Sequence, residues 1–457
     1  MEKFSIRWQN FRCLKDTGWL QIRPITIVIG PNASGKTSLH APLLLMKQTL
    51  DSPDTSLFLK VKGDLFNAGS YRDLIFNHET TNILAFSIRD ERYKGEIDSK
   101  DRKEIGVNRP GELNIEFDIP KDSNHIYLRK FQVRDIFGRE LVQRVRLKSG
   151  KFSIQGPNYR DIDRKLKDVI RDAPPEHFLF TFEPLFNFKI EKAIKEEEKP
   201  SEFTFEEPES LYLSVIRYVG GWIQYLLSNI SYIGPLRQHP KRLYEVTDEK
   251  PLDVGVRGQN TPEILFQENK TDLMKSVNEW VSKFEFGFQI SCEDLSHGAY
   301  EILLRRNKDA PGISLADTGF GLSQVLPLIV QGFYAKKGSI IIAEQPEIHL
   351  NPKLQALLSD LFVSIAKNGT GVIVETHSEH LLLRLRRLVA DGSISAEDVG
   401  LYYVEKTGGT SSIREVPIED DGHINSETWP KRFFEDALSE SLALASAQYE
   451  RSKENAS

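Results

Sequence analysis

A loop of the pattern G-x-x-x-x-G-K-[ST] is the feature that most constrains how this chain can fold. Residues 30–37 read Gly-Pro-Asn-Ala-Ser-Gly-Lys-Thr and follow the β-branched run Ile25-Thr-Ile-Val-Ile29. Such a run suits a fully buried parallel strand, and the apolar residues from about 36 to 50 predict a helix after the loop. At average glycine usage, a chance match in a chain of this length is on the order of one in a hundred. The sequence therefore predicts a strand, a tight loop and a helix in succession.

The chemistry of this loop indicates a nucleoside phosphate. Glycines let backbone N–H groups surround phosphate oxygens, and the following helix adds partial positive charge at its N-terminus. In this pattern the lysine reaches the β- and γ-phosphates, and the hydroxyl of the next residue ligates Mg²⁺. The predicted nucleotide contacts are Gly30, Asn32, Ser34, Gly35, Lys36, Thr37 and Ser38, and Thr37 is also a predicted Mg²⁺ ligand.

Pro42 falls inside the helix that we expect after the loop. An interior proline removes a backbone hydrogen bond and costs about 3 kcal/mol unless the helix bends. Because Leu43-Leu-Leu-Met46 continues the apolar pattern, we predict a kink at Pro42 within one continuous helix.

Composition excludes several classes of protein. The chain has 457 residues, 39% of them hydrophobic and 28% charged, which excludes global disorder and suggests about two or three domains. A formal charge of −6 means that nucleic-acid binding would need a local basic patch. Two cysteines, Cys13 and Cys292, make neither a disulfide framework nor a zinc site, which favours a reducing compartment. No signal peptide or membrane span is recognisable, so we expect a cytoplasmic protein.

Strand and helix patterns alternate towards both ends of the chain, which predicts an α/β protein with a parallel sheet covered on both faces. Between the ends, apolar and polar residues alternate over 112–155, which predicts an antiparallel meander. Heptads are not sustained, so we expect no long coiled coil. Further strands are expected at 4–8, 20–29, 82–90, 339–343, 371–375 and 401–405, helices at 160–172, 209–229, 323–335, from 352 and from 378, a solvated charged loop at 195–199 and a frayed tail after 448.

One apolar strand ends in acids that suit a bound triphosphate. Ile340-Ile-Ile-Ala343 leads into Glu344, Gln345 and, two residues on, Glu347. In proteins with a phosphate loop, a strand end of this kind carries the Mg²⁺-linked carboxylate. Glu344 is therefore the second predicted Mg²⁺ ligand, and a buried strand with solvated acids at its end is the alternative.

A second apolar strand also ends in a polar cluster. Val372-Ile-Val374 leads into Glu375-Thr-His377-Ser378. A lone histidine in such a place is often a satisfied structural residue. His377 lies 33 residues beyond Glu344, however, so we predict that it reaches the γ-phosphate.

Taken together, these residues resemble the ABC-type ATPases of the SMC, DNA-repair and OLD (overcoming lysogenisation defect) group over about 1–80 and 230–410. The resemblance implies an ABC-type ATPase head with a mixed sheet plus an antiparallel β meander and a compact mixed α/β insertion. The implied divisions are 1–90 and 231–405 for the two parts of the head, 91–230 for the insertion and 406–457 for a small extension, in which Trp429-Pro-Lys-Arg-Phe-Phe434 most resembles stand-alone bacterial ATPases.

The same resemblance assigns further contacts with ATP. Asn10-Phe-Arg12 looks like the opening strand of the group, in which Arg12 helps to hold the nucleotide. The segment 317–324, Asp-Thr-Gly-Phe-Gly-Leu-Ser-Gln, stands where the ABC signature stands, although it is not LSGGQ. Gly321, Ser323 and Gln324 would then contact the ATP of another subunit, because backbone N–H groups and a hydroxyl at a helix N-terminus suit a γ-phosphate. A homodimer or higher homo-oligomer with shared ATP sites is implied, and an N-capped helix is the alternative.

The position of the catalytic acid departs from the family pattern. Gln345 falls where the family has its catalytic glutamate, and a glutamine cannot act as a general base. Either Glu347 orients the water instead, or hydrolysis is slow and ATP mainly locks a closed dimer. Glu347, Gln345 and His377 are thus the catalytic candidates.

Several other segments have weaker signals. Arg237, in Tyr232-Ile-Gly-Pro-Leu-Arg237, is a speculative functional residue for which a structural role is as good an interpretation. No convincing Q-loop glutamine is present, and Asn67-Ala-Gly-Ser-Tyr71 lies nearest to its expected place.

Only 80 residues follow His377, too few for the TOPRIM nuclease domain of OLD proteins, and Glu419-Asp-Asp-Gly422 resembles a turn. Eight basic residues could contact phosphates, although a solvated meander is the preferred interpretation: Arg129, Lys130, Arg134, Arg139, Arg144, Arg146, Lys148 and Lys151.

The resemblance implies ATP and Mg²⁺ as ligands and a nucleotide-gated dimeric switch. Stand-alone ATPases of this kind resemble the sensor components of bacterial anti-phage systems, which act with a separately encoded nuclease or toxin. A DNA-repair or recombination ATPase that acts directly on DNA is one alternative, and an ATP-locked scaffold with negligible turnover is another. A transporter ATPase fits least, and no membrane partner is expected.

Overall fold

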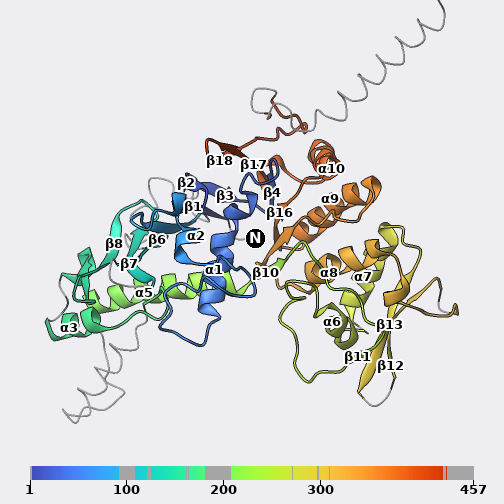
Figure 1. Cartoon of the computed structure of the whole chain (residues 1–457), viewed down its shortest axis with the longest axis horizontal. Helices are drawn as coiled ribbons and strands as arrows, with labels where there is room; N and C mark the ends of the chain where they lie inside the picture. The colour runs from blue at the N-terminus through green and yellow to red at the C-terminus, as the bar shows by residue number, and fades with distance from the viewer. Residues whose placement is uncertain are drawn as a thin grey trace, which may run out of the picture.

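The computed structural model describes residues 3–91, 109–120, 125–160, 162, 164–180, 207–269, 271–295, 298–307, 309–425 and 429. The charge run 195–199, residues 430–434 of the predicted extension and the tail after 448 lie outside the described residues. A 14-stranded sheet forms the body of the molecule, and a second sheet of 4 strands lies to one side of it (Figure 1).

The elements have the following bounds. The large sheet contains β1 (Phe4–Phe11), β2 (Leu14–Asp16), β3 (Leu20–Ile22), β4 (Ile25–Ile29), β5 (Leu84–Asp90), β6 (Pro110–Asp118), β7 (Tyr127–Asp135), β8 (Glu140–Arg146), β9 (Phe152–Gln155), β10 (Ile230–Ile233), β15 (Ile340–Glu344), β16 (Gly371–Glu375), β17 (Val399–Thr407) and β18 (Thr410–Glu415). The small sheet contains β11 (Tyr244–Glu245), β12 (Gln289–Asp294), β13 (Ala299–Arg305) and β14 (Ile313–Ser314). The α-helices are α1 (Ala41–Leu50), α2 (Tyr71–Leu74), α3 (Arg164–Asp172), α5 (Glu207–Ser228), α6 (Thr261–Gln267), α7 (Asp272–Lys283), α8 (Phe320–Tyr334), α9 (Pro352–Lys367) and α10 (Glu379–Ala390), and the 3₁₀ turns are η1 (Lys36–Leu39), η2 (Phe76–His78), η4 (Pro157–Tyr159), η6 (Leu315–Asp317) and η7 (Ala396–Asp398).

The strands that matter for the site run parallel in the order β10-β15-β16-β4-β17. Every residue of β4, β15 and β16 is buried, as the β-branched composition of these strands predicts. β16 lies between β4 and β15, and its residues pair with both neighbours. Because all these strands point the same way, their carboxyl ends meet at one edge of the sheet, where ligands of open α/β sheets bind.

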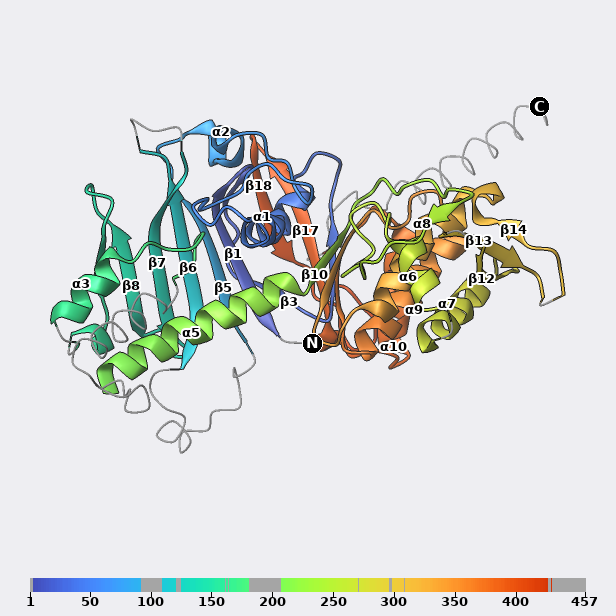
Figure 2. The same ribbon diagram turned by 90° about the horizontal axis from the view of Figure 1, so that it is seen from below.

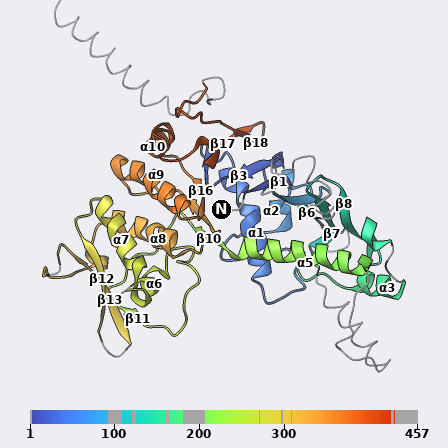
Figure 3. The same ribbon diagram turned by 180° about the vertical axis from the view of Figure 1, so that it is seen from behind.

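Helices cover both faces of the parallel strands. Alternate residues of β15 belong to different hydrophobic clusters: Ile340 and Ile342 to one, Ile341 and Ala343 to the other. The first cluster includes α1 and α5, and the second includes α8, α9 and α10. Figures 1 and 3 show these two groups of helices on opposite sides of the parallel strands. The predicted α/β class with a doubly covered sheet is therefore confirmed.

The predicted meander continues the same large sheet. β5 to β9 pair antiparallel in chain order beyond β1, and β18 and β2 connect them to the parallel strands. Helix α5 runs along this extension (Figure 2), and its apolar side chains join the cluster that includes Phe117 and Phe131. The sequence therefore located the meander correctly, while its continuity with the head follows from long-range pairing.

A small subdomain between β10 and α8 was not anticipated. It consists of the four short strands β11 to β14 with α6 and α7 packed beside them. Two asparagine side chains fasten it, since Asn269 and Asn278 exchange hydrogen bonds with backbone atoms of β12. Strands of two to seven residues leave little periodic signal in a sequence, which explains the omission.

The predicted kink at Pro42 is wrong. The helical segment divides at His40 into η1 and α1, and Pro42 lies in the first turn of α1. In the first turn of a helix, backbone N–H groups have no partner within the helix, so a proline there costs no hydrogen bond. Its fixed φ also suits the start of a helix. The proline thus starts a helix where we expected it to bend one. Among the described residues, no helix combines the length and apolarity needed to cross a membrane.

Candidate functional site

The phosphate loop is packed tightly at the carboxyl edge of the sheet. Gly30 has φ 154°, and a Cβ there would lie 2.2 Å from the carbonyl oxygen of Val404 in β17. Gly35 has φ 95°, and a Cβ there would lie 2.4 Å from Cys13 Sγ. Both glycines are required by close approach and by backbone conformation. The loop is therefore held between β17 and the turn that links β1 to β2.

Lys36 folds back over its own loop. Its Nζ donates to the carbonyl oxygens of Gly30, at 3.2 Å, and Pro31, at 2.9 Å. Burial lowers the pKa of Lys36, and the nearby charges of Glu375 and Glu347 act against that shift. A phosphate would exchange these neutral carbonyl contacts for charge-assisted ones.

A hollow of about 470 Å³ lies beside the loop. Its lining includes the predicted contacts Arg12, Gly35, Lys36, Thr37 and Ser38, together with Glu375. Of the other predicted loop contacts, Asn32 is exposed, and the carbonyl oxygen of Ser34 accepts a hydrogen bond of 2.6 Å from Ser411 Oγ. The structure thus brings Arg12, which is 18 residues before Gly30 in the sequence, to the hollow of the phosphate loop.

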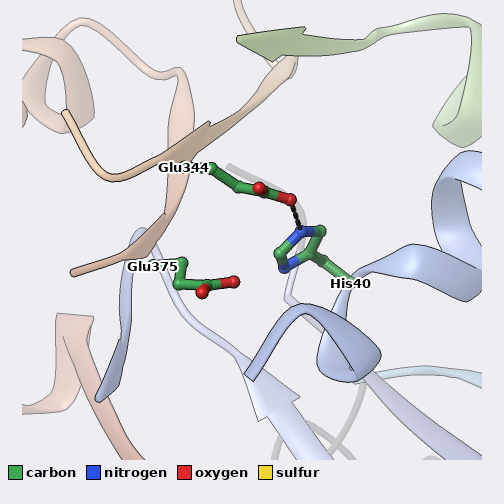
Figure 4. A group of neighbouring side chains, drawn as sticks. All are labelled: His40, Glu344 and Glu375. Carbon is green, nitrogen blue, oxygen red and sulfur yellow. Dashed lines mark hydrogen bonds and ion pairs between the residues drawn. The ribbon is translucent and has the colours of Figure 1, made fainter. Parts of the chain in front are cut away.

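Two buried carboxylates and a histidine meet below the loop (Figure 4). His40 Nε2 and Glu344 Oε1 are 2.8 Å apart, and Thr37 Oγ1 donates to Glu375 Oε2 at 2.9 Å. One ligand atom from each of His40, Glu344 and Glu375 lies within 4.8 Å of the others. The exposed fractions of the three residues are 0%, 9% and 6%. With the Thr37 hydroxyl, the two carboxylates of this group supply oxygen ligands of the kind that Mg²⁺ prefers.

The charges in this group depend on one another. Burial lowers the pKa of His40, but the hydrogen bond and charge of Glu344 outweigh it and raise the pKa above its usual value. Burial raises the pKa of Glu344, but His40 outweighs it and holds the pKa below its usual value. Burial raises the pKa of Glu375; the charge of His40 opposes this shift, and the like charge of Glu344 adds to it. His40 and Glu344 therefore form a charged pair, whereas burial disfavours the charged form of Glu375, which a nearby cation would stabilise.

Glu347 is held at the beginning of the next loop. Its Oε1 accepts a hydrogen bond of 2.7 Å from the backbone N–H of His377, and its Oε2 is buried without a hydrogen-bond partner among the described residues. Burial raises the pKa of Glu347. Burial, with the charge of Lys36, lowers the pKa of His377, which favours a neutral imidazole. A fixed carboxylate with a spare oxygen can orient a water molecule.

Gln345 and Arg237 shape the backbone at the end of β15. Gln345 has a left-handed backbone with φ 45°, and its N–H donates to the carbonyl oxygen of Glu375 at 2.7 Å. The guanidinium of Arg237 donates to the carbonyl oxygens of Pro235, Gln345 and Glu344 at 3.1, 3.3 and 3.4 Å. Burial lowers the pKa of Arg237 to about 10. Arg237 thus holds the backbone that carries the acids.

The signature-like segment lies elsewhere. Helix α8 begins at Phe320, three residues earlier than expected, so that Gly321, Ser323 and Gln324 fall in and just after its first turn. Ser323 and Gln324 are buried. Within the described part of the chain, none of the three lines the hollow of the phosphate loop. Asp317 is held by Arg242 through two hydrogen bonds of 2.6 and 2.7 Å.

Sequence reasoning missed His40 and assigned no role to Glu375. A signal existed for both residues, because His40 follows Thr37 by one helical turn and Glu375 ends a buried strand. Asn67, which lies nearest to the expected place of the Q-loop glutamine, does not line the hollow, and its Oδ1 accepts a hydrogen bond of 3.0 Å from the N–H of Gly69.

The two cysteines provide a labelling test of this site. Cys13 lines the hollow, 3.7 Å from Ser38 Oγ, whereas Cys292 is buried in β12, where burial raises its pKa to about 12. Because the thiolate is the reactive form, we expect iodoacetamide at about pH 8 to modify Cys13 and spare Cys292 in the native protein. Mg²⁺-ATP should slow the modification of Cys13. Mass spectrometry follows both sites, and denatured protein, in which both react, is the control. An ATP-independent rate at Cys13 would contradict this location for the nucleotide.

Comparisons with known proteins give distant structural similarities. A search of curated proteins gives no match. Among solved structures, the head of SMC bound to the C-terminal winged-helix domain of ScpA has 13% identity and a TM-score of 0.40, covering 91% of this chain and 97% of that one. An Smc head with an extended coiled coil, bound to the C-terminal domain of ScpA from Pyrococcus furiosus, has 14% identity and a TM-score of 0.41, covering 90% and 96%. The SMC head domain of Thermotoga maritima has 13% identity and a TM-score of 0.38, covering 92% and 100%.

Two family descriptions match the sequence itself. The description "Protein of unknown function (DUF3696)" matches residues 394–444. The description "AAA domain, putative AbiEii toxin, Type IV TA system" matches residues 25–384, which include the phosphate loop, both acid strands and the signature-like segment. This range is most of the chain and agrees with the P-loop ATPase recognised in the sequence. The chain therefore belongs to the AAA-domain family that carries the AbiEii-type description.

Proposed function

We propose that the protein is an ATP-hydrolysing, nucleotide-gated switch in which ATP closes pairs of subunits. The observation that carries this proposal is the convergence of Lys36, Thr37 and Glu375 at one hollow. Backbone N–H groups of the loop and the Lys36 ammonium supply the charge that phosphates need. When bound, Mg²⁺ would neutralise part of the phosphate charge. Thr37 and one of the two buried carboxylates, Glu375 or Glu344, would hold it.

The signature-like segment supports a second subunit at the site. Gly321, Ser323 and Gln324 are predicted to bind a γ-phosphate, yet the hollow of their own chain is lined by other residues. A shared site, in which the segment of one copy closes over the nucleotide of another, is consistent with both this prediction and the lining of the hollow. His377, whose lowered pKa favours the neutral form, would donate its one ring N–H to the γ-phosphate.

The proposal is tested by light scattering with and without ATP, beside an ATP turnover assay. We expect the mass in solution to increase with Mg²⁺-ATP and to return to its starting value after turnover. A mass that ATP leaves unchanged would contradict a shared site. Retained ATP with negligible turnover would favour an ATP-locked scaffold over a hydrolytic switch.

We further propose a cytoplasmic role as the regulatory ATPase of a bacterial anti-phage system with a separate nuclease or toxin. The AbiEii-type family description supports such a role, because it associates the domain with a toxin–antitoxin system. The assignment is one of family analogy and not of site chemistry. Co-purification from cells that express the neighbouring genes tests it, and the absence of any ATP-dependent partner would oppose it.

The alternative of a DNA-acting ATPase receives little support from the meander. Its basic residues are engaged locally: Arg129 and Lys130 pair with Glu116, and Arg134 pairs with Glu112. Arg144 is buried with its guanidinium over the ring of Phe180. Local pairing neutralises charge that DNA phosphates would need. DNA-stimulated turnover with steep salt dependence would nevertheless favour this alternative.

A further inference from the structure

We propose that Glu375 is the acid that holds the divalent cation of bound ATP against Thr37, and that Glu344 is a positioning residue that His40 and Tyr232 fix in place. The inference rests on the proposed function, because it concerns the cation that accompanies ATP. The pattern of acids along the sequence led to the opposite ranking, in which Glu344 was the cation ligand and Glu375 had no role.

The strand register places Glu375 nearer the phosphate loop. In the parallel pairing, Glu344 lies opposite Glu375, and Glu375 lies opposite Val28 of β4, the strand that leads into the loop. β15 is one strand further away, and neighbouring strands are about 4.8 Å apart. The side chain of Glu375 therefore starts one strand spacing closer to Thr37 than the side chain of Glu344 does.

The contact with Thr37 is direct. Thr37 Oγ1 donates its proton to Glu375 Oε2 at 2.9 Å. A hydroxyl that donates its proton in this way keeps its lone pairs, which are the electrons that a cation binds. The carboxylate then lies beside the cation-binding oxygen, where its charge acts at short range in a partly desolvated place. Glu375 can thus orient the hydroxyl and stabilise the cation at the same time.

Glu344, by contrast, is held by other residues. Its Oε1 lies 2.8 Å from His40 Nε2, and the nearby side chain of Tyr232 also interacts with this carboxylate. Figure 4 shows the imidazole of His40 to one side of the two carboxylates, with a hydrogen bond to Glu344. His40 is completely buried, so a move of Glu344 towards a cation would leave the imidazole without its hydrogen-bond partner.

The lining of the hollow gives the same ranking. Among the described residues, its carboxylates are Asp73 and Glu375, and Glu344 does not line it. Asp73 is occupied in a turn, where its Oδ2 accepts hydrogen bonds of 2.9 and 2.7 Å from the N–H and hydroxyl of Ser70. Glu375 is therefore the lining carboxylate that contacts a predicted cation ligand.

The test measures how much Mg²⁺ tightens ATP binding in the full chain. Calorimetry with ATP, with Mg²⁺ or with EDTA, is run on wild type, Glu375→Gln and Glu344→Gln. The second substitution compares the rival acid directly, because it makes the same chemical change at the paired position of the neighbouring strand. We expect Glu375→Gln to weaken the Mg²⁺-dependent tightening by about 10- to 100-fold and to leave ATP binding in EDTA unchanged. We expect Glu344→Gln to weaken the Mg²⁺-dependent tightening by less than a third of the fold-change seen for Glu375→Gln.

Retained tightening in Glu375→Gln, or an equal or larger loss in Glu344→Gln, would overturn the ranking. If wild type binds no ATP, or if the Lys36→Ala variant binds ATP as tightly as wild type does, the proposed function itself is contradicted. A second readout is the EPR spectrum of Mn²⁺ bound with ATP, which should change with Glu375→Gln and stay close to wild type with Glu344→Gln. If Glu375→Gln does not fold, Glu375→Asp keeps the charge but withdraws the oxygen from Thr37, and the same losses are expected in part.

Discussion

Lys36→Ala is expected to abolish ATP-dependent pairing and to weaken ATP binding by about 10- to 100-fold. Hydrogen bonds to charged groups contribute about 1.5–3 kcal/mol each, which corresponds to that range of affinity. The Lys36 ammonium donates to carbonyl oxygens of its own loop and acts on the buried Glu375 and Glu347 only through its charge, so its removal breaks no ion pair among the described residues. Binding of a fluorescent ATP analogue and light scattering measure the two effects.

Lys47→Ala is the matched control for this experiment. Lys47 lies on α1, the helix that follows the loop, and pairs with Asp51 one turn later at 3.3 Å. The substitution Lys47→Ala removes the same type of side chain at a residue that does not line the hollow. We expect ATP binding and pairing like those of wild type. Loss of pairing in both variants would indicate damage to the helix and not to the phosphate site.

Glu347→Gln is expected to lower ATP turnover by about 10²- to 10⁴-fold, which is the usual contribution of general-base assistance. The geometry supports Glu347 over Gln345, because the backbone N–H of His377 holds one oxygen of Glu347 while its other oxygen is buried without a partner among the described residues. The carboxylate must be ionised to act as a base. Since burial raises the pKa of Glu347, turnover should fall as the pH drops through that raised value, at a higher pH than for an exposed glutamate.

Gln345→Glu distinguishes the two interpretations of the acid strand. If Glu347 orients the water, this substitution changes turnover little. If it speeds turnover strongly while Glu347→Gln has no effect, the Glu347 assignment fails and the chain is a slow, ATP-locked switch. Glu285→Gln is the control, because Glu285 is exposed and pairs with Lys353 away from the site. Steady-state phosphate release under saturating Mg²⁺-ATP measures all three variants.

Local patterns predicted most elements near the site. The β-branched runs before the loop, before Glu344 and before Glu375 are the fully buried strands β4, β15 and β16. Such strands can be recognised because burial on both faces demands continuous apolar residues. The small sheet and the position of Pro42 in the first turn of a helix were not predicted. The signals of short strands and of a proline near a helix start depend on their neighbours in the fold.

The sequence by itself determined that a glycine loop, a lysine and a hydroxyl would follow a buried strand, and that acids would end two others. Only the tertiary structure decided which acid lies beside the hydroxyl. Along the chain the order is β4, β15, β16, but in the sheet β16 lies between β4 and β15. Strand order follows from long-range pairing and from the crossover helices, which no local spacing of residues encodes. For that reason Glu375, and not Glu344, contacts Thr37.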